Sequence, residues 1–93
     1  MSEASETVEI TNQRGLHARA SAKFVTFVSR LPDTVSVEVE KGGSRVNGTS
    51  IMGLLTLAAA QGTTVSVSAL GPQAEAALDA LQALLGNRFG EDE

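Results

Sequence analysis

Three valines at every second position constrain the fold of this chain more than any other feature. Val35, Val37 and Val39 alternate with polar residues, so the valines share one side of the chain. This period of two is typical of a β-strand with one buried face. A Lys-Gly-Gly turn at 41–43 follows, and we predict a hairpin whose second strand covers 44–47.

Two more strands and three helices follow from the same kind of periodicity. Alternation at 7–11 and at 65–69 predicts half-buried strands. Three other segments carry apolar residues at helical spacing, and each predicts a helix with one apolar face. These faces consist of Ala20, Phe24, Phe27, Val28 and Leu31; of Ile51, Leu54, Leu55 and Ala58; and of Ala74, Ala77, Leu78, Leu81 and Leu85.

Start and stop signals bound the helices. Pro32 is expected to stop the first helix. Ser50 offers a capping hydroxyl for the second helix, and Gly62 is expected to end it. The third helix opens after Gly71-Pro72 and closes at Gly86.

The order of the elements predicts the fold class. Strand, helix, two strands, helix, strand and helix form an α+β domain of two layers, because each strand and each helix has one apolar face. The helices are expected on one side of a largely antiparallel sheet, whose other side meets water. The 93 residues suit a single domain over 1–93, with 1–6 and 87–93 as flexible tails.

Composition excludes several classes of function. Without cysteine there are no disulfides, thiolate nucleophiles or Cys-based zinc sites. A net charge of −4 without Trp or Tyr argues against nucleic-acid binding. The apolar stretch 51–60 is too short to span a membrane, and 1–6 does not resemble a secretion signal. We therefore expect a cytoplasmic protein that acts at its surface on protein partners or small anions, with neither metal nor cofactor.

The only histidine, His17, lies between Gly15 and the first predicted helix. The first turn of a helix presents unpaired N–H groups and the positive end of the helix dipole, which suit phosphate. A largely neutral imidazole there can attack phosphorus without first losing a proton. Arg19 supplies a fork-shaped cation for phosphoryl oxygens.

This hypothesis has a geometric requirement. Two helical positions lie about 200° apart around the helix, so His17 and Arg19 converge only if His17 lies in the cap. Gly15 supplies the backbone freedom for such an entry. The alternative remains open that His17 is only a cap and Arg19 a solvated charge.

Two motifs, 15–19 (Gly-Leu-His-Ala-Arg) and 46–53 (Val-Asn-Gly-Thr-Ser-Ile-Met-Gly), resemble HPr, the histidine-containing phosphocarrier of the bacterial sugar phosphotransferase system. The resemblance covers nearly the whole chain. It implies an open-faced β-sandwich in which three helices cover one face of a four-stranded antiparallel sheet. It also implies that enzyme I, charged by phosphoenolpyruvate, phosphorylates His17 on Nδ1, after which the group moves to a IIA component. Arg19 matches the arginine that supports the phosphohistidine, and the amides of Ala18 and Arg19 would bind the phosphate.

Other positions carry further implications of the resemblance. Ala20 stands where many members have proline, which leaves the branch of the family open. Ser50 matches the serine that HPr kinase/phosphorylase modifies in carbon catabolite regulation; its alternative role is an ordinary N-cap. Ile51, Met52 and Leu55 match the partner-docking surface; their alternative role is core packing.

The protein is thus expected to be a monomeric carrier, covalently modified during turnover, and no stand-alone enzyme. The alternatives are a nitrogen-related HPr paralogue, a regulatory binding module that acts through Ser50, and an α+β domain without phosphate chemistry. The intact His17 and Arg19 count against the regulatory module. The sequence does not name a sugar, because that specificity would reside in downstream permeases.

Overall fold

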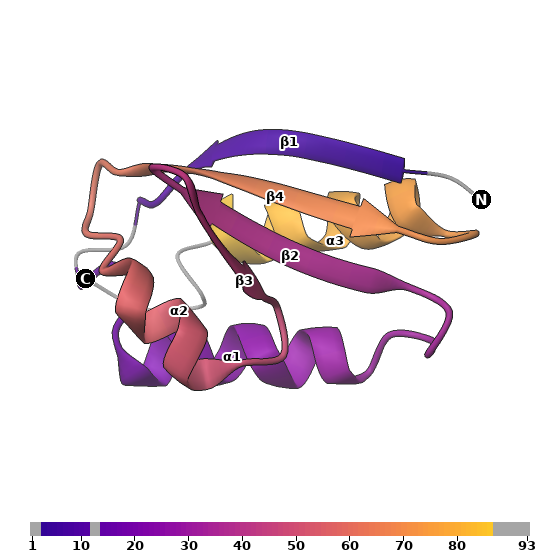
Figure 1. Ribbon diagram of the computed structural model, residues 1–93, viewed down its shortest axis with the longest axis horizontal. Helices are drawn as coiled ribbons and strands as arrows, with labels where there is room; N and C mark the ends of the chain where they lie inside the picture. Colours follow the sequence, from indigo (N-terminus) through magenta and orange to yellow (C-terminus); the bar gives the residue numbers. More distant parts are fainter. Residues whose placement is uncertain (1–2, 12–13, 87–93) are drawn as a thin grey trace.

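The computed structural model describes residues 3–11 and 14–86, which form four strands and three helices. Figure 1 shows the helices on one side of the sheet, so the predicted α+β fold, a two-layer open-faced sandwich, is confirmed. In chain order the elements are β1 (Glu3–Glu9), α1 (Ala18–Ser29), β2 (Ser36–Lys41), β3 (Ser44–Asn47), α2 (Ile51–Leu57), β4 (Thr64–Leu70) and α3 (Ala74–Gly86).

The sheet has the strand order β1-β4-β2-β3, and every neighbouring pair is antiparallel. The last strand of the chain, β4, therefore lies inside the sheet, where Leu70 pairs with Glu3 on one side and with Ser36 on the other. The predicted hairpin joins β2 to β3 through Gly42 and Gly43, which both have positive φ. A two-residue turn of this kind matches the twist of the flanking strands and favours glycine.

The core lies between the two layers. Each helix contributes a side chain that is at most 2% exposed: Phe24 from α1, Leu54 from α2 and Leu81 from α3. The alternating valines of β2 and β4 are buried opposite them. Burying a side chain of this size is worth about 1.5–3 kcal/mol, so the apolar stripes stabilise the two-layer arrangement.

The first strand begins earlier than its alternation predicted. It covers Glu3–Glu9, whereas the sequence predicted a strand over 7–11 and a flexible tail over 1–6. The expectation was wrong for residues 3–6, because their backbone pairs with β4 from Leu70 to Val67. Hydrogen bonding to a neighbouring strand thus outweighs the polar side chains of this segment. The other tail residues, 1–2 and 87–93, lie outside the described residues.

The second helix ends earlier than predicted. It stops at Leu57 rather than at Gly62, because Ala58 adopts a left-handed conformation with φ 52°. The Nζ atom of Lys41 donates hydrogen bonds to the carbonyls of Leu57 at 2.8 Å and Ala58 at 3.3 Å. The end of α2 is therefore fixed by a side chain from another element and not by a local glycine.

The ends of the other helices agree with the sequence. α1 ends at Ser29, three residues before Pro32, and α3 ends at Gly86. No helix in the described part of the chain is long and apolar enough to cross a membrane.

Candidate functional site

His17 is the N-cap residue of α1. Its backbone is extended, with φ −78° and ψ −179°, so His17 lies outside the helix, as convergence with Arg19 requires. The side chain is half-buried, and the ring is therefore not enclosed by the fold.

The Nδ1 atom of His17 faces the start of the helix. It accepts hydrogen bonds from the backbone amides of Arg19 at 3.1 Å and Ala20 at 3.4 Å. The resemblance implies that the amides of Ala18 and Arg19 bind phosphate. In the structure, the amides of Arg19 and Ala20 donate to the ring. Alanine at position 20 matters here, because proline would lack this N–H donor.

A second segment of the chain supports the loop before His17. Gly15 is buried with φ 65°, and a Cβ atom built on it would lie 2.3 Å from the Ala59 carbonyl oxygen. The Leu16 amide donates a hydrogen bond of 2.8 Å to that same oxygen. The turn after α2 thus packs against the residues before His17 and holds their backbone in position. Local sequence patterns did not indicate this contact, because it joins segments more than 40 residues apart.

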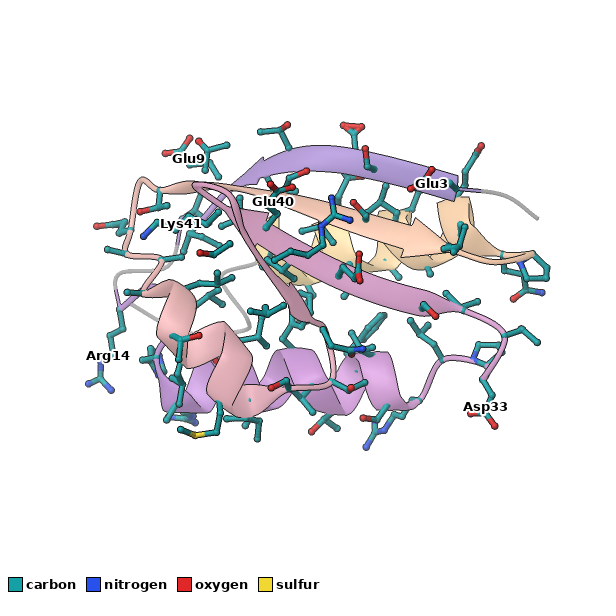
Figure 2. The ribbon with its side chains drawn as sticks, viewed as in Figure 1. Glu3, Glu9, Arg14, Asp33, Glu40 and Lys41 are labelled. Carbon is teal, nitrogen blue, oxygen red and sulfur yellow. The ribbon has the colours of Figure 1, made fainter. Side chains whose placement is uncertain are left out.

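Positive charge gathers around the site. Two of the four basic residues between Glu9 and Asp33, Arg14 and Arg19, flank His17, and this stretch has no acidic residue although the whole chain has a net charge of −4. Arg14 and Arg19 are exposed near His17, and Figure 2 shows Arg14 at the opposite end of the molecule from Asp33. Basic side chains and helix amides at one end favour an anionic group there.

Ser50 is the N-cap of α2, as expected. Its Oγ accepts a hydrogen bond of 2.9 Å from the Gly53 amide, and the side chain is half-buried. A Cβ atom on Gly53 would lie 3.0 Å from this Oγ and 3.0 Å from the Val46 Cβ. Gly53 therefore allows the first turn of α2 to pack closely on β3.

The predicted docking residues differ in exposure. Met52 is 70% exposed and Ile51 40%, whereas Leu55 is half-buried. α2 packs beside α1, the helix that His17 caps (Figure 1). Two large apolar side chains are thus available to a partner on the helix next to the site.

The described residues contain no group of three His, Cys, Asp or Glu side chains placed to hold a metal ion. The groups present at the site are the His17 ring, the amides at the start of α1 and the exposed Arg14 and Arg19. A neutral imidazole whose Nδ1 electron pair faces helix amides can bond to phosphorus, and the freed amides can then donate to phosphoryl oxygens. An open-faced sandwich with such a histidine defines the class of histidine phosphocarriers.

Comparison with known proteins identifies the family. The family model described as PTS HPr component phosphorylation site matches residues 4–87, and the chain belongs to this family. It is 47% identical over 88 residues to phosphocarrier protein HPr of Neisseria meningitidis serogroup B, with 95% of this chain and 97% of the relative covered. It is 38% identical over 87 residues to phosphocarrier protein NPr of Escherichia coli K12, with 94% and 96% covered.

Solved structures agree with this assignment. The crystal structure of HPr-C-His from Thermoanaerobacter tengcongensis is 42% identical, with a TM-score of 0.87 and all of both chains covered. An HPr dimer from the same organism is 43% identical, with a TM-score of 0.73 over 90% of this chain and 94% of that one. The protein is a phosphocarrier of the HPr family, and the predicted resemblance is confirmed.

Proposed function

We propose that His17 accepts a phosphoryl group on Nδ1 from phosphorylated enzyme I and donates it to a IIA component of the phosphotransferase system. The observation that carries this proposal is the direction of Nδ1, which accepts hydrogen bonds from the Arg19 and Ala20 amides at the start of α1. The family supports the choice of partner enzymes, and the half-buried ring supports access for them.

The transfer follows from this geometry. Because Nδ1 is an acceptor, the neutral ring carries its proton on Nε2, and the Nδ1 electron pair can attack phosphorus. As the new P–N bond forms, the bond from phosphorus to the donor breaks in line, and its electrons stay with the donor. The two amides then donate to phosphoryl oxygens in place of Nδ1. The Arg19 guanidinium offsets the added negative charge.

The test is phosphorylation with enzyme I, magnesium and phosphoenolpyruvate, followed by mass spectrometry. The expected product is an acid-labile, base-stable adduct on His17. His17→Ala and His17→Asn should both lose it, and the asparagine serves as the matched control because it retains a capping side chain. An adduct that persists in His17→Asn would contradict the proposal.

Regulatory phosphorylation of Ser50 by an HPr kinase/phosphorylase is a second proposal for this chain. The phosphate would add about −1.5 to −2 charge beside the exposed Ile51 and Met52, and would thereby weaken docking to an apolar partner surface. Mass spectrometry after incubation with ATP and the kinase tests it. Thr49→Ala is the matched control and should still accept the phosphate. Phosphate on Thr49 instead of Ser50 would refute the assignment.

The nitrogen-related branch remains the alternative within the family. Transfer to a sugar-specific IIA component or to a nitrogen-related one distinguishes the two, with the same phosphorylated protein offered to both acceptors. A cytoplasmic location is part of the proposed function in either branch.

We also propose that the protein works as a monomer. Edge strand β1 carries Glu3, Glu6 and Glu9, and charged residues on an edge strand oppose pairing with a second chain. Sedimentation analysis tests this proposal, since a dimer at micromolar concentration would contradict it.

A further inference from the structure

Lys41 reaches from the end of β2 to the end of α2. Its Nζ atom donates to the Leu57 carbonyl at 2.8 Å and to the Ala58 carbonyl at 3.3 Å. Figure 2 shows the labelled side chain directed toward the turn that follows α2. The last turn of α2 has no basic residue of its own, so Lys41 supplies the positive charge that the C-terminal carbonyls of a helix favour.

The turn that Lys41 contacts is conformationally costly. Ala58 has φ 52° and ψ 42°, and it is the only non-glycine residue with positive φ among residues 3–11 and 14–86. A residue with a Cβ atom pays roughly 1–2 kcal/mol in this left-handed region. Contacts from elsewhere must therefore hold the turn in place, and the two Lys41 hydrogen bonds are such contacts.

The same turn supports the loop before His17. Ala59 is buried, and its carbonyl accepts a hydrogen bond of 2.8 Å from the Leu16 amide. Gly15 lies so close to Ala59 and Ala60 that no Cβ atom fits between them. A shift of the turn would therefore move the backbone that leads into the cap of α1.

We propose that Lys41 is a positioning residue for phosphoryl transfer, which acts on His17 through the left-handed turn at Ala58 and the hydrogen bond between Ala59 and Leu16. The hydrogen bonds of Lys41 to Leu57 and Ala58 end at the turn after α2, so its proposed effect on the ring is indirect. This inference rests on the proposed function of His17 and adds a residue from the β2–β3 hairpin to the site.

The experiment compares Lys41→Met with Lys41→Arg. Lys41→Met keeps a long stem without the charge, and we expect kcat of phosphorylation by enzyme I to fall about fivefold to tenfold, with KM little changed. Hydrogen exchange at the Leu16 amide should become about tenfold faster, whereas exchange at Val67 in the central strand β4 should not change. Lys41→Arg should keep both values near those of the wild type, because it still donates to carbonyls.

Two further variants make the test specific. Arg45→Met removes a positive charge from the same hairpin, where Arg45 pairs with Glu38 and Glu40, and should leave both readouts unchanged. Ala58→Gly removes the cost of the left-handed turn, so adding it to Lys41→Met should restore kcat and Leu16 exchange. This rescue separates positioning from a general loss of stability.

An unchanged kcat and an unchanged Leu16 exchange rate in Lys41→Met would overturn the inference. An equal loss in Arg45→Met would also overturn it. So would a double variant, Lys41→Met with Ala58→Gly, in which neither value is restored. The exchange measurement needs no enzyme I, so it judges the contact even if His17 is not the acceptor. Absence of phosphate on His17 in the wild type would instead overturn the proposed function.

Discussion

The Nδ1 atom of His17 lies 3.1 Å from the backbone nitrogen of Arg19, two residues further along the chain, and accepts its hydrogen bond. The extended backbone of His17 makes this approach possible, because a helical residue would direct its side chain back toward the preceding turn. The nucleophilic electron pair is therefore held on the side of the ring where α1 presents the amides that have no partner within the helix.

The tautomer of the neutral ring follows from this contact. Nδ1 accepts a hydrogen bond, so the proton of neutral His17 should reside on Nε2. Nitrogen-15 NMR at a pH where the ring is neutral should show a pyridine-type Nδ1 and a protonated Nε2. A dominant Nδ1–H form would contradict the site geometry described here.

Replacing Arg19 should slow transfer without unfolding the protein. Arg19→Met removes an exposed guanidinium, and we expect the rate of transfer to a IIA component to fall about tenfold, which corresponds to about 1.4 kcal/mol. Arg30→Met is the matched control, because Arg30 is exposed at the other end of α1. Equal rates in the two variants would remove Arg19 from the site.

A side chain at Gly15 should destabilise the protein strongly. In Gly15→Ala the new Cβ meets the Ala59 carbonyl at a buried position with φ 65°, and we expect a loss of about 3 kcal/mol or more in urea unfolding. Gly42→Ala is the control, since Gly42 has φ 57° but open space around it, and should cost only about 1 kcal/mol. Similar losses in both would mean that backbone conformation alone, and not the contact with Ala59, requires glycine at position 15.

The capping role of Ser50 predicts a stability difference. Ser50→Ala removes the acceptor of the Gly53 amide and should lower the free energy of unfolding by about 1 kcal/mol. Ser50→Asp keeps a capping oxygen and should retain most of that stability while weakening partner binding through its charge. Unfolding curves and binding titrations together test this, and a large stability loss in Ser50→Asp would argue against the capping role.

The exposed part of α2 should matter for partners and little for folding. Met52→Ala should weaken binding to enzyme I about tenfold and change the unfolding free energy by less than about 0.5 kcal/mol, because Met52 is 70% exposed. Leu70→Ala is the control: Leu70 is 42% exposed and pairs with Glu3, which Figure 2 places at the far end from Arg14. Equal affinity losses would show that the docking surface is not on α2.

Sequence patterns could predict the parts of this protein that depend on neighbours along the chain. The alternation of Val35, Val37 and Val39 indicated a one-sided strand, and the apolar spacing within 74–85 indicated the buried face of α3. Gly15, His17 and Arg19 indicated a cap geometry because their separation of two to four positions is a local property. These features need no knowledge of the fold.

Tertiary structure alone decided which distant backbone groups meet. Residues 3–6 became part of β1 because β4 supplies their hydrogen-bond partners. The helix α2 ends at Leu57 because Lys41 and the close approach of Gly15 hold the turn that follows. The physical reason is that a backbone amide or carbonyl carries no sequence signature and must nevertheless be satisfied when buried. Its partner is set by the packing of the whole domain, and here that packing also holds the segment that leads into His17.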